Sequence, residues 1–117
     1  MKMSEYNPDH WVMLKFTNEE NGTVVYKILA GWSGSYLYGA SWKLNSGVTK
    51  IEEDGQCYLF HGSSGSVYRC HKNNYGLTGY TAGILESFYR DIEKAELKIK
   101  LECLDEEKTN FMELHYE

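Results

Sequence analysis

Four features are scarce in this 117-residue sequence: proline, paired cysteines, long apolar runs and, over two stretches, carboxylates. Pro8 is the single proline, so no later residue interrupts a helix or strand with a pyrrolidine ring. No apolar run approaches the roughly 18 residues that a membrane-spanning helix needs, and residues 1–9 lack the apolar segment of a signal peptide. The sequence therefore predicts one domain, residues 1–117, in the cytoplasm and without membrane contact.

The cysteines argue against a disulfide framework and against a metal centre. Cys57, Cys70 and Cys103 form no CxxC pair, and an odd number favours reduced thiols. The four histidines add no spacing typical of metal ligation. No carboxylate lies between residues 55 and 85 to orient a Cys–His or Ser–His pair. We therefore expect no cofactor and favour a non-enzymatic protein over an enzyme.

Carboxylates are absent from Asn21–Ile51 and from Gly55–Leu85, although the chain contains 17 acidic residues. Such stretches are typical either of packed sheet or of a place where an anion binds. Residues 86–117 hold ten acids and five bases, which equals the net charge of −5 for the whole chain. This charge disfavours binding of long nucleic acid, which depends on neutralising phosphates.

The pentapeptide Gly-x-Ser-Gly-Ser occurs once in each carboxylate-free stretch, at Gly31–Ser35 and Gly62–Ser66. Each copy lies between apolar or aromatic runs, which predicts a loop between two strands, and the two units are candidates for a tandem duplication. Neither copy matches a Walker A loop, a dinucleotide fingerprint or a hydrolase elbow. Two interpretations stay open: plain strand connections, or cradles of N–H and hydroxyl groups for an anion.

The overall pattern predicts an α+β domain with an antiparallel sheet of about six or seven strands and one helix near residues 81–95, packed on one face. The pair Asn21-Gly22 marks a hairpin, and either Thr78 or Thr81 is expected to cap the helix. The ends, residues 1–10 and 105–117, are candidates for mobile segments. Strands are expected at residues 11–16, 23–30, 36–38, 42–44, 48–52, 57–61, 67–71 and 97–103.

Basic and aromatic residues gather around the two pentapeptides. In an extended strand Arg69 and His71 project side by side, roughly 6–7 Å apart, where Arg offers a planar fork to phosphate and His adds a donor. The aromatic residues suit stacking on a base or sugar, although such residues are more often core or rim. The alternative for the basic pair is a solvated face with partners from the acidic helix or tail. The candidate ligand-binding residues are Trp32, Ser33, Ser35, Tyr36, Lys43, Ser64, Ser66, Arg69, His71, Lys72 and Tyr75.

Four segments, Tyr6–Val12, Gly31–Tyr36, Ser41–Gly47 and Gly65–Lys72, resemble small uncharacterised accessory proteins encoded by tailed bacteriophages. The resemblance covers about residues 6–85 and carries over no catalytic residue. It implies a protein of the host bacterial cytoplasm that acts against the host, for example in counter-defence.

Three functions follow from these observations. The first is a non-enzymatic phage accessory protein that sequesters a small phosphorylated nucleotide. The second is an inhibitor that contacts a host protein directly through exposed aromatic residues. The third is a small enzyme acting on a nucleotide or sugar. A homo-oligomer is compatible with all three.

Overall fold

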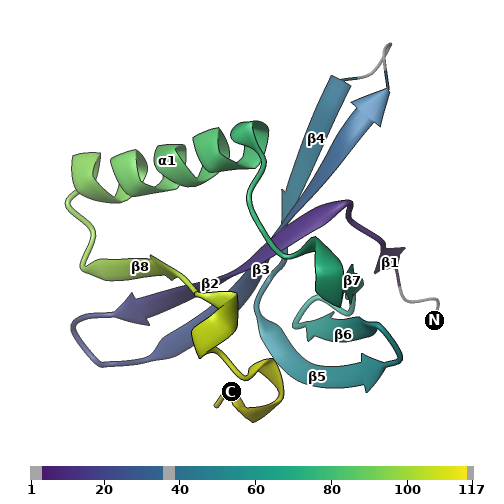
Figure 1. Ribbon diagram of the computed structural model, residues 1–117. Helices are drawn as coiled ribbons and strands as arrows, with labels where there is room; N and C mark the ends of the chain where they lie inside the picture. Colours follow the sequence, from purple (N-terminus) through teal and green to yellow (C-terminus); the bar gives the residue numbers. More distant parts are fainter. Residues whose placement is uncertain (1–3, 36–38, 116–117) are drawn as a thin grey trace.

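The computed structural model describes residues 4–35 and 39–115, and within them the chain forms eight β-strands and one α-helix (Figure 1). The helix α1 spans Gly79–Lys94, and short 3₁₀ helices lie at Lys72–Asn74, Glu106–Lys108 and Phe111–Glu113. The predicted α+β class is confirmed. The strands are β1 (Glu5–Tyr6), β2 (His10–Asn18), β3 (Val24–Ser35), β4 (Gly39–Leu44), β5 (Val48–Asp54), β6 (Cys57–Gly62), β7 (Val67–His71) and β8 (Ile99–Cys103).

The described strands divide into two sheets of four, so the predicted single sheet of six or seven strands is not confirmed. One sheet has the order β4-β3-β2-β8 and is antiparallel throughout; the other has the order β1-β7-β6-β5, with β1 parallel to β7. The break falls after β4. Asn45 pairs with Ile28 through its backbone N–H (3.0 Å) and its side-chain oxygen (2.8 Å). Gly47, at a φ of 135°, then turns the chain into the second sheet.

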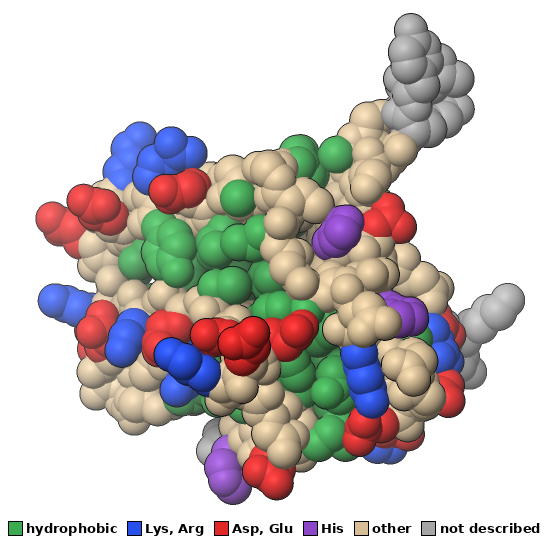
Figure 2. Space-filling view, viewed as in Figure 1, with side chains coloured by type: hydrophobic (Ala, Val, Ile, Leu, Met, Phe, Trp, Pro, Cys, Tyr) green, Lys and Arg blue, Asp and Glu red, His purple; other side chains and the backbone are tan. Residues whose placement is uncertain are grey.

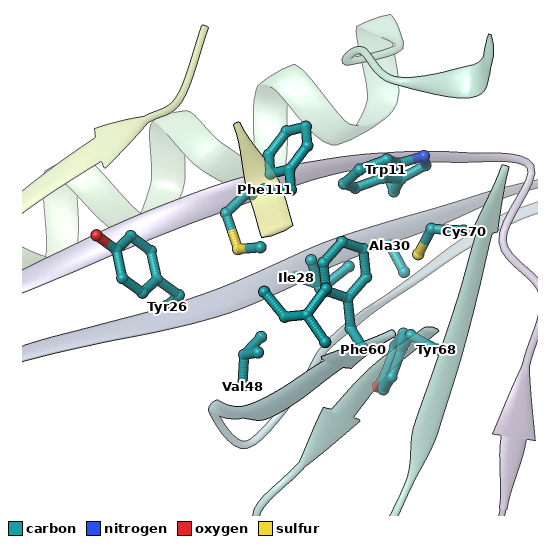
Figure 3. Close-up of a cluster of buried hydrophobic side chains, with 11 residues drawn as sticks. Trp11, Tyr26, Ile28, Ala30, Val48, Phe60, Tyr68, Cys70 and Phe111 are labelled. Atoms are coloured by element: carbon teal, nitrogen blue, oxygen red, sulfur yellow. The ribbon is translucent and has the colours of Figure 1, made fainter. Parts of the chain in front are cut away.

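The larger core cluster lies between the two sheets (Figure 3). Trp11 and Met13 of β2 pair with Ala30 and Ile28 of β3 and point to the same face, because side chains alternate along a strand. The second sheet supplies the opposing side chains, Val48, Ile51, Phe60, Tyr68 and Cys70.

The other face of the β4-β3-β2-β8 sheet is covered by α1. Val12, Leu14 and Leu29 pack there against Leu85 of the helix and Leu101 of β8. The helix begins at the Thr78 cap, one of the two predicted positions, and the Thr81 hydroxyl accepts a hydrogen bond from the Thr78 N–H (2.9 Å). This reciprocal pair is a capping box, which satisfies two backbone donors at the helix start.

The C-terminal acidic segment packs against the main core through Phe111 and Leu114. Phe111 is 3% exposed, and its ring centre lies 5.4 Å from that of Trp11 and 5.5 Å from that of Tyr75. The N-terminal strand β1 pairs with β7 at Glu5 and Tyr6. Both segments therefore contribute contacts to the fold. Within the described residues, no helix combines the length and the apolar character needed to cross a membrane.

Candidate functional site

The two sheets meet at their edges in an open cleft of about 760 Å³. Strand β1 forms one side with Glu5 and Tyr6, and the β3–β4 hairpin forms the other. Trp32 of β3 pairs with Ser41 of β4, which brings Trp32, Ser41 and Lys43 into one lining. The remaining lining residues are Asn7 and Trp42.

One hydrogen bond, one ring–ring contact and one cation–π contact fix the aromatic lining of this cleft. The indole Nε1 of Trp32 donates to the carbonyl of Asn7 (3.0 Å), and the Tyr6 and Trp32 ring centres are 6.4 Å apart at 71°. The Nζ of Lys43 lies 5.0 Å from the centre of the Tyr6 ring, a cation–π contact. Within the described residues Lys43 forms no ion pair with a carboxylate. The cleft therefore presents aromatic rings beside an ammonium group that no carboxylate of the described residues neutralises.

The first pentapeptide forms no loop, contrary to prediction: Gly31–Ser35 continues strand β3, with a register shift between Trp32 and Ser35. The backbone N–H of Ser33 donates to Asp9 Oδ2 (2.8 Å), which anchors the strand to the segment after β1. Ser35 ends β3, paired with Gly39. Tyr36 and the predicted strand at residues 36–38 lie outside the described residues.

The second pentapeptide forms the turn between β6 and β7, as predicted. It contacts the turn after β4: the backbone N–H of Ser64 donates to Ser46 Oγ (2.9 Å). The Ser66 carbonyl accepts the N–H of Gly62 (2.8 Å) within the turn itself. The backbone N–H of Ser64 and the backbone carbonyl of Ser66 are therefore both engaged within the fold.

The two glycines of each copy serve the same two structural purposes. A Cβ at Gly31 would lie 2.6 Å from Thr81 Cγ2, and one at Gly62 would lie 3.1 Å from Ser46 Oγ, so the first glycine permits a close approach. Gly34 and Gly65 adopt φ values of 74° and 95°, a region that favours glycine. The repeated motif is thus explained by backbone geometry at two hairpins.

Two of the predicted cations are neutralised by acids far from them in the sequence. Arg69 Nε lies 2.8 Å from Glu5 Oε1, and its Nη1 lies 2.9 Å from Asp54 Oδ2. Lys72 Nζ lies 2.5 Å from Glu53 Oε2. The partners come from β1 and from the end of β5, and not from the acidic helix or tail that the alternative interpretation named. These pairs sit on the second sheet and join its strands.

His71 and Tyr75 are engaged in the fold. The Nδ1 of His71 accepts the Asn73 N–H (3.2 Å), and its carbonyl accepts the indole N–H of Trp11 (2.8 Å). The Tyr75 hydroxyl accepts the Met13 N–H (3.1 Å) and donates to the Leu104 carbonyl (2.6 Å). Burial raises the pKa of this phenol well above its usual range. The structure therefore brings Trp32 and Lys43 together and places the other described candidates in separate contacts.

Sequence reasoning missed Tyr6, which lies between the two pentapeptide units. The Tyr6 ring contacts Trp32 of the first pentapeptide. It also contacts Tyr68, which follows the second pentapeptide by two residues, and the centres of the Tyr6 and Tyr68 rings are 5.1 Å apart. The sequence predicts a mobile end at residues 1–10 because the two residues of β1, shortly before Pro8, are too few to show the alternation typical of a strand. The one signal in the sequence that could indicate Tyr6 as a site residue is the presence of an aromatic side chain in a short polar segment.

The cleft offers rings, amide and hydroxyl groups, one carboxylate and one ammonium group, and its described lining includes no histidine or cysteine. Across residues 4–35 and 39–115, no group of three His, Cys, Asp or Glu side chains is arranged to hold a metal ion. The chain matches no protein-family model, no curated protein and no solved structure.

Proposed function

We propose that this chain is a non-enzymatic binding protein that holds a small planar ligand with a single anionic group in the cleft between β1 and the β3–β4 hairpin. The supporting observation is that Trp32 and Lys43, two of the candidates from the sequence, line the same cleft. Its volume of about 760 Å³ is in the range of ligand sites. A nucleoside monophosphate matches this lining best.

The ligand's parts correspond to the cleft's groups. Stacking of a base on an aromatic ring such as Trp32 is worth roughly 1–3 kcal/mol, and Lys43 binds phosphate as a point charge. Asn7 and Ser41 supply hydrogen-bonding groups to the sugar or base. Because Arg69 and Lys72 are already paired with carboxylates, Lys43 is the one cation of the cleft's described lining that remains for the ligand. One phosphate therefore suits the cleft better than two or three.

The resemblance to phage accessory proteins supplies a setting for this activity. A protein that binds a nucleotide signal without changing it lowers the free concentration of that signal by mass action. We propose that it does so in the host bacterial cytoplasm, as a counter-defence factor.

Calorimetric titration with adenosine and guanosine mono-, di- and cyclic monophosphates tests the proposal. We expect saturable binding of at least one monophosphate, and its recovery unchanged after the protein is denatured. Trp32→Leu should abolish binding while Trp32→Phe, which keeps a ring, should retain part of it. The absence of binding heat with every nucleotide would contradict the proposal. Recovery of a chemically converted nucleotide would favour the small-enzyme alternative.

A second candidate function, inhibition of a host protein by direct contact, is favoured by the β3–β4 hairpin. The hairpin projects from the body of the molecule (Figure 1), and β4 is an edge strand whose first five residues are exposed. Exposed edges pair with other chains. This function predicts that a partner protein is captured from host lysate in stoichiometric amount. Trp42→Glu should release this partner, and Met112→Glu, at another exposed apolar side chain, should retain it.

A further inference from the structure

Helix α1 leaves apolar side chains uncovered along its border with β8. Tyr89 is 39% exposed and Leu97, just after the helix, is 48% exposed. Ile92 and Cys103 are half-buried against the helix-side core. Figure 2 shows hydrophobic side chains gathered on the face that Figure 1 assigns to α1 and β8. We call the set Tyr89, Ile92, Leu97 and Cys103 the α1–β8 strip.

The strip follows one face of α1 into the turn after the helix. Tyr89 and Ile92 are three residues apart on the helix and share one face, and the Leu97 N–H donates to the Ile92 carbonyl (3.0 Å). The pKa of the Tyr89 phenol is raised by burial first, and then by the neighbouring Cys103, Glu102 and Glu86. Ile92 of the helix and Cys103 of β8 pack against the same buried cluster, which joins the helix side of the strip to the strand side.

Acidic residues outnumber basic ones around this strip: residues 86–106 hold seven acids and the four bases Arg90, Lys94, Lys98 and Lys100. Glu86 and Glu93 lie about one helical turn on either side of Tyr89, and Asp105 and Glu106 follow the end of β8. In the described part of residues 86–117, Glu102 is the one acid with an ion pair, to Lys100 at 3.7 Å. The acids of the second sheet, by contrast, are paired with Arg69, Lys72, Lys50 and His61. The described surroundings of the strip therefore keep a net negative charge, and most of their carboxylates are not held in an ion pair.

These two properties decide the kind of partner. A second copy of the chain would bring two net-negative rims together, and an anionic lipid surface would also be repelled by this net charge. A segment with an apolar stripe flanked by Lys and Arg matches both the apolar side chains and the charge. An amphipathic helix supplies that stripe at the i, i+3, i+4 and i+7 spacing. We propose that the α1–β8 strip docks a basic amphipathic helix of a partner protein.

The test uses a synthetic 14-residue Leu/Lys peptide with its leucines at helical spacing, followed by chemical-shift changes in the full chain. We expect saturable shifts at Tyr89, Ile92 and Leu97. The double variant Tyr89→Ser/Leu97→Ser should weaken binding at least about tenfold, and Glu86→Gln/Glu93→Gln should weaken it several-fold and reduce its salt dependence. Met112→Ser, at a 40% exposed methionine outside the strip, serves as the matched control.

Two control peptides separate recognition from nonspecific attraction: one with the same composition in a scrambled, non-periodic order, and one with Glu in place of Lys. Both should bind at least about tenfold more weakly than the periodic Lys peptide. The proposal is overturned if the periodic peptide does not bind up to about 1 mM, or if the scrambled peptide binds equally well. Equal binding by the Tyr89/Leu97 variant, or shifts confined to another surface, would also overturn it.

Discussion

The ammonium nitrogen of Lys43 lies 5.0 Å from the centre of the Tyr6 ring, and this contact joins an edge strand of one sheet to an edge strand of the other. The bond from Trp32 to the Asn7 carbonyl spans the same junction. The cleft exists because these two edges meet without forming a continuous sheet. Its lining therefore depends on the packing of the two sheets as well as on its own residues.

Substitution of Gly31 by alanine should destabilise the protein. The new Cβ would lie 2.6 Å from Thr81 Cγ2, and Thr81 is 3% exposed and belongs to the capping box of α1. Crowding of this kind costs typically 1–3 kcal/mol. Urea unfolding followed by circular dichroism measures the change.

Gly83→Ala is the matched control, because no heavy atom lies within 4 Å of a Cβ placed there and the position is helical. Alanine is favoured over glycine in a helix by about 1 kcal/mol, so this variant should gain stability. Loss of stability in both variants, or in neither, would contradict the role assigned to Gly31.

The fold illustrates what local patterns can and cannot predict. Period-two alternation placed β5, β6 and β7 within two residues of their ends, because hairpin turns and strands are encoded locally. The division into two sheets depends on Asn45, whose side chain pairs with Ile28 from 17 residues away. The periodicity of apolar residues along the sequence does not indicate a side-chain contact of this kind. The sequence predicts a loop at Gly31–Ser35 for a similar reason. Gly31 permits the close approach of Thr81 of α1, and sequence spacing does not reveal that contact.

Removal of the Tyr75 hydroxyl should cost about 1–3 kcal/mol, because two backbone groups lose their partner inside the protein. Tyr75→Phe leaves the Met13 N–H and the Leu104 carbonyl without the bonds they make to this phenol. Tyr80→Phe is the control, since Tyr80 is 41% exposed and a surface change usually stays within about 0.5 kcal/mol. Equal unfolding midpoints for the two variants would show that the Tyr75 bridge does not stabilise the fold.

The Glu52 carboxylate should give part of the stability a dependence on acidic pH. Hydrogen bonds from His61 (2.7 Å) and then Lys50 (3.3 Å) lower its pKa below 4.5. A carboxyl whose pKa is lower in the folded state stabilises the fold above its unfolded pKa, and this contribution is lost as pH falls through the folded value.

Glu52→Gln should therefore be less stable than the original protein at pH 6, and the difference should shrink below about pH 4.5. Denaturation midpoints measured from pH 7 to pH 3 test this, with Glu20→Gln, in the exposed β2–β3 turn, as control. A difference that stays constant over this range would rule out the carboxylate as its source.

The candidate site was predictable only in part. Trp32 and Lys43 were identified because aromatic and basic residues gathered near the pentapeptides. Arg69 and Lys72 met the same criterion, but their partners Glu5, Asp54 and Glu53 are 64, 15 and 19 residues away in the sequence. Basic residues in a stretch without carboxylates can thus be neutralised by carboxylates from neighbouring strands. Charge patterning along the chain indicates where cations are, and only the fold determines which of them remain unpaired.

The most direct test of the central claim is the affinity of the chain, with and without Lys43, for whichever of adenosine and guanosine monophosphate it binds more tightly. Lys27 provides the matched control, because its Nζ lies 5.7 Å from the centre of the Phe16 ring, a similar cation–π contact outside the cleft. We predict that Lys43→Gln weakens binding at least about tenfold, a loss of about 1.4 kcal/mol, and that Lys27→Gln changes it less than about twofold. Equal affinities in the three proteins, or no binding up to about 1 mM, would contradict the assignment of the cleft as a nucleotide site.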